Sequence, residues 1–170
     1  MDILDLIKSR RSIRFFENKP VDKETIYRIL EAGRWAPSGL NNQPWKFVII
    51  TNQEYKEKIG NLSHYKRIFI TAPVLIGVFL DSSTIYHREK DIMGIGACFQ
   101  NMLLEIHSLG LGGVWLGEIL KAKDEVRKIL ELDKNFELMG FIAFGYPDKD
   151  KIKNLSGKRK SLEELILKEF

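Results

Sequence analysis

The sequence predicts a single α+β domain over residues 1–170. Its predicted helices and strands do not alternate strictly, so the pattern differs from that of a doubly wound sheet. Hydrophobic residues make up 44% of the chain and charged residues 29%, as in ordinary folded globular proteins. A chain of 170 residues is also long enough to bury one sizeable core.

The first half of the chain carries a clear amphipathic helix. Asp22 is the expected N-cap of a helix over residues 23–34, and Ile26, Ile29 and Gly33 share one face of it. We therefore expect this face to pack against the core.

A strongly apolar run covers residues 68–80 and contains Pro73. It is too short to cross a bilayer as a helix, and we interpret it as a buried strand whose regular part is residues 74–80. The N-terminal residues place acids before bases and have no long apolar stretch. We expect no secretory signal, a cytoplasmic location and no membrane partner.

The longest predicted helix covers residues 90–109, where apolar side chains recur every three or four positions. Cys98 lies inside it, and we interpret this thiol as core packing. Ser161 and Glu164 have capping-box spacing and predict a last helix that begins at Ser161. The remaining predicted elements are helices at residues 3–8, 54–62 and 124–132, strands at 46–51, 113–116 and 137–144, and a basic loop at 146–160.

Composition argues against several classes of site. One cysteine and three scattered histidines favour neither a disulfide nor a metal centre. The net charge of +4 is concentrated at residues 8–19 and 149–160. Two short basic segments suit a small anion such as a phosphate better than nucleic acid, so we expect no nucleic-acid partner.

Two basic segments are candidate phosphate sites. One follows the first helix and the other precedes the predicted last helix, where guanidinium and hydroxyl donors can bind phosphate oxygens. A solvated basic surface is the alternative interpretation of both segments. The candidate donors are Arg10, Arg11, Ser12, Arg14, Lys158 and Arg159.

The loop at residues 36–45 has the sequence APSGLNNQPW and lies between a predicted helix and a predicted strand. Its amide side chains can donate and accept hydrogen bonds, which suits a heterocycle with alternating N–H and C=O groups. The alternative is a helix C-cap at Gly39 with Asx-turns at Asn41 and Asn42.

Four glycines occur in GLGGVWLG, residues 110–117, and would let the backbone approach a flat ligand. Termination of the long helix at Gly110, followed by a tight turn, is the alternative. The G-x-G-x-x-G pattern fails at Trp115, which disfavours a Rossmann site.

Taken in order, RRSIRFF, APSGLNNQPW, GACFQNMLLEIHSLGLGGVWLG and the late basic pair resemble the nitroreductase family over nearly the whole chain. The resemblance implies a central, mostly antiparallel sheet flanked by helices, in an intertwined homodimer with FMN at the subunit interface. It also implies an FMN-dependent oxidoreductase that takes hydride from NADH or NADPH by a ping-pong mechanism. Nitroaromatic, quinone or similar electrophilic acceptors would then be reduced, with no catalytic side chain, because the flavin carries the chemistry.

The resemblance also implies roles for individual residues. Those assigned to the FMN phosphate are Arg10, Ser12 and Arg159, with Arg11 and Lys158 assisting. Those assigned to the flavin ring are Arg14, Gly112 and Gly113, together with Pro37, Ser38, Asn41 and Gln43 of the other subunit.

Two functional alternatives remain open at this point. One is a noncatalytic FMN-binding or sensory protein, and the other is a specialised flavin enzyme with a different acceptor, such as a quinone, a free flavin or a halogenated aromatic. Residues 81–89 leave little room for a helical insertion over the flavin. We therefore expect an open pocket with little substrate selectivity.

Overall fold

The computed structural model describes residues 2–153, 155 and 157–170. Its centre is an antiparallel sheet of four strands in the order β1-β2-β4-β3. The strands are β1 (Trp45–Ile50), β2 (Val74–Asp81), β3 (Gly112–Leu116) and β4 (Phe136–Gly145). The predicted α+β class and the antiparallel sheet are therefore confirmed.

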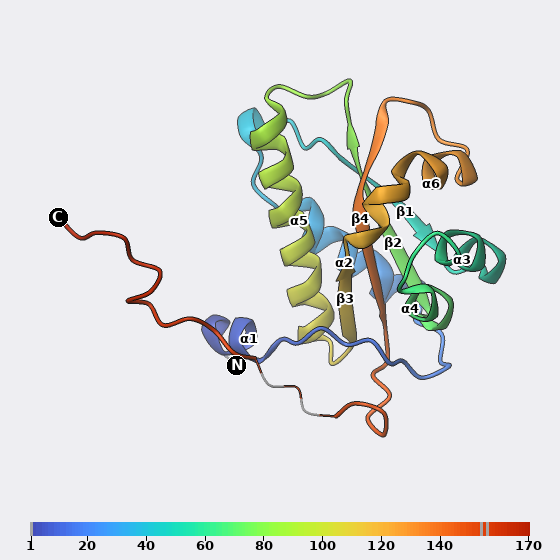
Figure 1. The fold of residues 1–170 in the computed structure, drawn as a ribbon, viewed down its shortest axis with the longest axis horizontal. Helices are drawn as coiled ribbons and strands as arrows, with labels where there is room; N and C mark the ends of the chain where they lie inside the picture. Colours follow the sequence, from blue (N-terminus) through green and yellow to red (C-terminus); the bar gives the residue numbers. More distant parts are fainter. Residues whose placement is uncertain (1, 154, 156) are drawn as a thin grey trace.

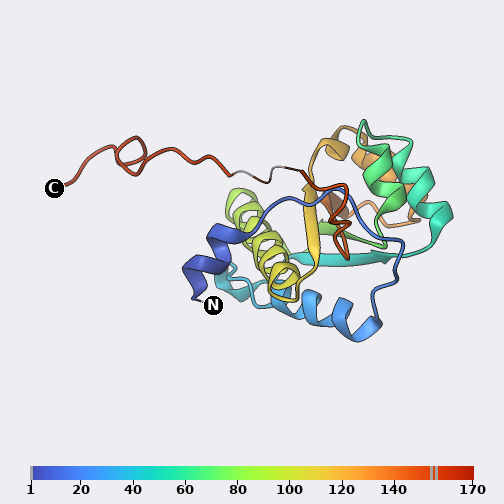
Figure 2. The same ribbon diagram turned by 90° about the horizontal axis from the view of Figure 1, so that it is seen from below.

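Helices cover both faces of the sheet (Figures 1 and 2). One face carries α2 (Lys23–Arg34) and α5 (Arg88–Ser108). The other carries α3 (Gln53–Gly60), α4 (Lys66–Thr71) and α6 (Lys123–Ile129). The remaining elements are α1 (Ile3–Ser9) and two 3-10 turns, η1 (Gly39–Asn41) and η2 (Glu118–Ala122).

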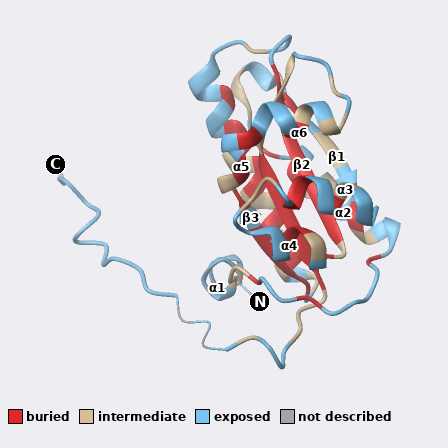
Figure 3. Cartoon of the chain, turned by 45° about the vertical axis from the view of Figure 1, so that its right-hand side comes forward, coloured by how far each residue is buried: buried red, intermediate tan, exposed pale blue. Residues whose placement is uncertain are grey.

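Strand β2 is buried along its whole length because it lies between two strands and two helical layers. Val74, Ile76 and Val78 join the core under α2 and α5, whereas Leu75 and Phe79 join the core under α3 and α4. A strand with two buried faces is apolar at every position instead of alternating. Figure 3 shows the buried residues running through the sheet and into α5.

Helix α2 has the predicted bounds and the predicted cap. The Thr25 backbone N–H donates to Asp22 Oδ1 at 2.7 Å, which satisfies a free amide of the first turn. A Cβ at Gly33 would lie only 2.8 Å from Met102 Cγ, so glycine lets α2 approach α5 closely.

Helix α4 corrects our interpretation of the apolar run at residues 68–80, because Ile68 and Phe69 are helical and only the part from Val74 onward is a strand. A uniformly apolar run has no periodicity that separates a buried helix from a buried strand. Pro73 marks the boundary, and Ala72 before it has the extended backbone that a following proline favours.

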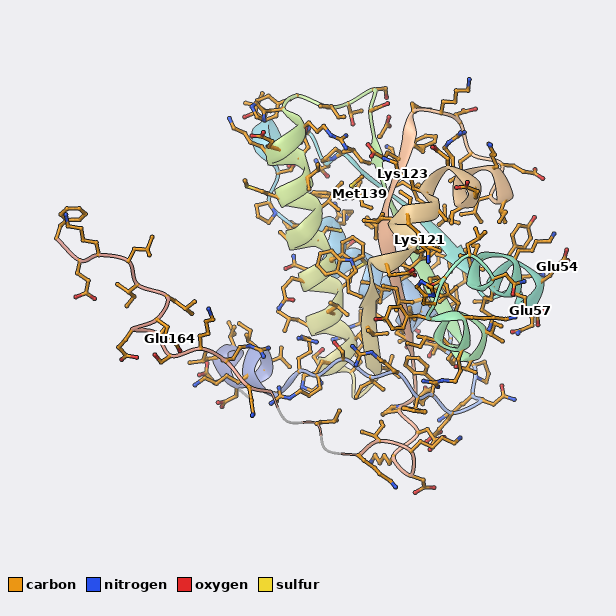
Figure 4. The ribbon with its side chains drawn as sticks, viewed as in Figure 1. Glu54, Glu57, Lys121, Lys123, Met139 and Glu164 are labelled. Atoms are coloured by element: carbon orange, nitrogen blue, oxygen red, sulfur yellow. The ribbon has the colours of Figure 1, made fainter. Side chains whose placement is uncertain are left out.

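The predicted last helix is wrong. The capping box forms, since Ser161 N donates to Glu164 Oε2 at 2.9 Å and Glu164 N to Ser161 Oγ at 3.4 Å, but it closes a single turn. This segment extends away from the domain, where the Glu164 side chain is labelled in Figure 4. A single turn is not stable as a helix without a packing partner, and neither hydrophobic cluster of the described residues includes its apolar side chains. The exposed apolar residues of the segment are Leu162, Leu165, Ile166, Leu167 and Phe170.

The other predicted elements are present, with ends displaced by a few residues at most. Within the described ranges, no helix is long and apolar enough to cross a membrane.

Candidate functional site

The segment after α1 lies along strand β3 at the edge of the sheet. Ser12 forms a parallel bridge with Gly113, and the Ile13 backbone N–H donates to the Gly113 carbonyl at 3.0 Å. A Cβ at Gly112 would lie 2.6 Å from Ile13 Cγ2, so only glycine lets the segment lie this close. The predicted glycine pair thus holds the basic segment in place.

The two predicted basic segments meet in one pocket of about 310 Å³. Its walls bring together five residues that we predicted, along with two that we did not, Leu155 and Gly157. The predicted residues in the lining are Arg10, Arg11, Ser12, Arg14 and Arg159.

The pocket carries uncompensated positive charge. In the described part of the chain, no carboxylate forms an ion pair with any of its four arginines. Burial, followed by the charges of Arg159 and Arg11, holds the pKa of Arg10 below its usual value. Arg10 Nε is buried and has no hydrogen-bond partner among the described residues. A buried cationic donor without an acceptor is the group that a bound anion would satisfy.

Arg11 has a different part in this pocket. Its Nε donates to the Leu155 carbonyl at 3.0 Å, and its NH1 donates to the carbonyls of Lys8 and Arg10 at 2.5 and 2.8 Å. A Cβ at Gly157 would lie 2.8 Å from the Arg11 guanidinium carbon. Arg11 therefore ties the late basic segment to the early one, and its assisting role toward a phosphate stays a prediction.

Lys158 does not line the pocket, and its carbonyl accepts a hydrogen bond from Arg159 NH1 at 2.8 Å. Its direct contact with a phosphate stays a prediction. His107 in the last turn of α5 lies beside the cluster, where its Nε2 is 2.8 Å from Ser9 Oγ. Burial and the charges of Arg10 and Arg11 lower the pKa of this histidine.

The amide-rich loop contains the turn η1 and lies against the first half of α5. Pro37, Ser38 and Gly39 line a second pocket of about 280 Å³ with residues of that helix. Asn41 and Gln43 lie in the same turn but not in the lining, and Gln43 Nε2 donates to the Asn41 carbonyl at 3.1 Å.

The helix C-cap alternative at Gly39 is wrong, because α2 ends earlier and its C-cap is Trp35. Gly39 instead opens the 3-10 turn, where a Cβ would lie 2.3 Å from the Tyr86 ring. By contrast, the structure confirms that the long helix terminates at Gly110. This glycine has a φ of +72°, and Leu111 N donates to the Ile106 carbonyl at 3.0 Å. This is a Schellman C-cap of α5.

The structure does not bring the two predicted halves of the site together within one chain. The arginine pocket lies near His107, at the C-terminal end of α5, whereas the amide-rich turn lies near Gly94. These two positions are about 20 Å apart along the helix at 1.5 Å per residue. Figure 1 shows α1 beside the lower end of α5 and the cyan 3-10 turn η1 beside its upper end.

Two residues beside the turn were missed from the sequence. Asn42 Nδ2 donates to Asp91 Oδ1 at 2.8 Å, and Asp91 is completely buried. The first turn of α5 contains two acids, Glu89 and Asp91, so residue type alone does not single out Asp91.

The chain's one cysteine, Cys98, lies within α5. Cys98 is buried, and burial raises the pKa of its thiol to about 12, so the core-packing interpretation is confirmed. Over the described residues, no group of three or more His, Cys, Asp or Glu side chains could hold a metal ion.

Comparisons with known proteins agree on one family. The family model named Nitroreductase family matches residues 7–65 and 62–146. A Methanothermobacter thermautotrophicus protein named "Putative NADH dehydrogenase/NAD(P)H nitroreductase" is 37% identical over 150 residues, which are 86% of this chain and 78% of that protein. An iodotyrosine deiodinase of Thermotoga neapolitana is 28% identical over an alignment 177 residues long, gaps included, that covers 89% of this chain and 91% of that protein.

Solved structures give the same result. A Desulfovibrio desulfuricans protein described as a "putative nitroreductase in complex with fmn" superposes with a TM-score of 0.93 at 41% identity, covering 99% of this chain and 97% of that chain. An NADH oxidase structure from Clostridium acetobutylicum, also named as putative, has a TM-score of 0.87 at 32% identity, covering 98% of this chain and 100% of that chain. The matched model, the identities and the shared fold together establish that this chain belongs to the nitroreductase family.

Proposed function

We propose that this protein is an FMN-dependent oxidoreductase that takes hydride from NADH or NADPH. The observation that carries the proposal is the arginine pocket, where, among the described residues, Arg10 Nε is buried without an acceptor and no carboxylate forms an ion pair with an arginine of the pocket. A terminal phosphate supplies the missing negative charge and several acceptor oxygens. The donor set therefore fits FMN.

The chain's own residues would bind and orient the cofactor. Arg10, Ser12 and Arg159 would hold the phosphate, and Arg11 would fix the late segment that carries Arg159. Arg14 would lie near the pyrimidine side of the ring, where a fixed cation favours the reduced form electrostatically. When bound, FMN accepts a hydride and passes electrons on, so the protein need supply no nucleophile.

We also propose that two copies of this chain build each site. The arginine pocket and the amide-rich turn lie at opposite ends of α5, so the turn that completes one pocket would come from a second chain. Symmetric dimers commonly build sites in this way.

Exposed apolar side chains support the same assembly. Helix α1 has no buried residue, and the exposed apolar side chains after Ser161 join neither hydrophobic cluster of the described residues. Apolar surface on this scale is typical of an interface between chains. The exposed apolar residues of α1 are Ile3, Leu4 and Ile7, and those around the turn and the start of α5 are Trp35, Leu40, Ile92 and Met93.

We propose nitroaromatic compounds, quinones or similar electrophiles as acceptors. Strand β2 ends at Asp81 and α5 begins at Arg88, so no helical insertion stands between them. Such an open pocket would admit the nicotinamide donor and then the acceptor at the same place, as ping-pong kinetics require. Likeness to the Thermotoga neapolitana deiodinase favours halogenated aromatic compounds as a second acceptor class.

Anaerobic reduction tests the proposed function. The purified protein, loaded with FMN, should lose its visible flavin absorption when NADH or NADPH is added and regain it with a nitroaromatic compound or a quinone. Iodotyrosine in place of these acceptors tests the second class. If FMN binds but stays oxidised with both nucleotides, the proposed oxidoreductase activity is contradicted and a noncatalytic flavin-binding protein is supported.

A further inference from the structure

The first turn of α5 contains a completely buried carboxylate, Asp91. Its Oδ2 accepts from the backbone N–H groups of Tyr86 and His87 at 3.0 and 3.1 Å, and its Oδ1 accepts from Asn42 Nδ2 at 2.8 Å. Among the described residues, no lysine or arginine forms an ion pair with this carboxylate. Three directed donors near a helix N-terminus therefore keep it charged in the interior.

Asn42 connects this carboxylate to the amide-rich turn. Its Nδ2 donates to Asp91 Oδ1 and also to the Thr84 carbonyl at 3.1 Å. If the Asn42 amide were flipped, its oxygen would face the Thr84 carbonyl and the Asp91 carboxylate, which both only accept hydrogen bonds. These two neighbours therefore determine that Nδ2 points toward them. One side chain thus joins η1 to the loop before α5 and to α5 itself.

The turn that Asn42 anchors is held in an unfavourable backbone conformation. Leu40, Asn41 and Gln43 have φ angles of 53°, 55° and 47°, in the left-handed region that side chains other than glycine disfavour. Such a cluster persists only where the surrounding structure over-determines it. The hydrogen bond from Gln43 N to Ser38 Oγ at 3.0 Å is an exposed restraint, and the part-buried Asn42–Asp91 pair is a second one.

We propose that Asn42 and Asp91 are positioning residues that hold the turn at residues 38–43 ready for the flavin. The proposal rests on the proposed function, since the turn carries Ser38, Asn41 and Gln43. In this proposal Asn42 and Asp91 act on the turn and not on the cofactor itself. Their role is to hold a disfavoured backbone conformation before the cofactor arrives, so that binding does not have to impose it.

Asn42→Asp tests the pair, because it keeps the shape of the side chain and replaces the donor by a second carboxylate. At pH 8, two carboxylates at hydrogen-bond distance repel each other, whereas at pH 5.5 one shared proton restores a hydrogen bond between them. We expect Asn42→Asp to raise the FMN Kd about tenfold or more at pH 8, and the ratio to wild type to return toward one at pH 5.5.

Two further variants complete the experiment. Asn42→Ala removes the donor without adding charge, so its smaller increase in Kd should be the same at both pH values. Asp81→Asn is the matched control: Asp81 is also a buried carboxylate at the end of this loop, but it accepts from Ser83 and Asn135. The FMN Kd of Asp81→Asn, divided by that of wild type, should be the same at pH 8 and at pH 5.5.

Other titratable groups cancel in this comparison. His87 and Tyr86 of the loop and Lys90 of α5, which donates to the Tyr86 hydroxyl at 2.8 Å, are the charged or titratable groups beside the pair. All three are present in wild type, in both Asn42 variants and in the control, and each variant is compared with wild type at the same pH.

Hydrogen exchange of the protein without FMN separates this proposal from the proposed function. Amides of residues 38–43 should exchange faster in Asn42→Asp than in wild type at pH 8 but not at pH 5.5, whether or not FMN binds. Equal exchange in both proteins, or a Kd ratio for Asn42→Asp that is independent of pH, would overturn the positioning role. Failure of wild type to bind FMN, with the exchange difference present, would overturn only the proposed function.

Discussion

Replacing Arg10 by alanine should weaken FMN binding while leaving the protein folded. Arg10 Nε is buried with no partner in the described chain, so the phosphate would be its acceptor. A hydrogen bond to a charged group contributes about 1.5–3 kcal/mol. The expected increase in the FMN Kd is therefore about 10- to 150-fold.

The surroundings of Arg10 make the prediction sharper. Burial, followed by the charges of Arg159 and Arg11, disfavours the charged form of Arg10, which is why its pKa is lowered. Removing Arg10 relieves this repulsion. The variant without FMN should accordingly be at least as stable to urea as wild type, although its FMN affinity is lower.

Fluorescence titration of the FMN-free protein measures this effect. Arg159→Ala should behave similarly, and Lys160→Ala is the control, because it removes the same charge from a neighbouring position that does not line the pocket. An Arg10→Ala variant that binds FMN as tightly as wild type would refute the assignment of the phosphate to this pocket.

Three further predictions concern residues around the arginine pocket and in the core. Gly112→Ala should cost about 1–3 kcal/mol of folding free energy and weaken FMN binding, because the new Cβ would displace Ile13. Gly117→Ala is the control: a Cβ there has open space, so neither stability nor FMN binding should change. The pKa of His107 is lower in the folded protein than in the unfolded chain, so as the pH falls below about 6.5 the unfolded chain protonates this histidine first. The free energy of unfolding should therefore decrease below that pH. His107→Gln should flatten this dependence in urea titrations at pH 7 and pH 5, and an unchanged slope would contradict it. A thiol reagent at pH 8 should modify Cys98 only after unfolding, because burial raises the pKa of that thiol to about 12; rapid labelling of the native protein would show otherwise.

Local patterns in the sequence predicted the elements whose signals are themselves local. Helix α2 follows from its cap at Asp22 and its apolar face, and both were found as expected. The missed helix α4 and the wrong last helix depend on information outside their own residues. Ile68 and Phe69 belong to an apolar run without periodicity, and the segment after Ser161 needs a packing surface that the described residues do not provide.

The candidate site divides in the same way. Charge and residue type identified Arg10 and Arg159, and the structure then placed both in one pocket. The Asn42–Asp91 pair could not be found from local pattern, because its two members are distant in sequence and meet only when α5 packs beside η1. Pairings of this kind depend on tertiary structure.

Mixed dimers test most directly the central claim that two chains build one flavin site. Chains with Arg10→Ala and Arg159→Ala would be combined with chains that carry Asn41→Ala, and the mixed species purified with two different tags. Our account predicts one tight FMN site for each mixed dimer, because one of its two sites then contains only wild-type residues. Mixed dimers with no tight site, binding FMN as weakly as the two variant homodimers, would contradict a site shared between chains.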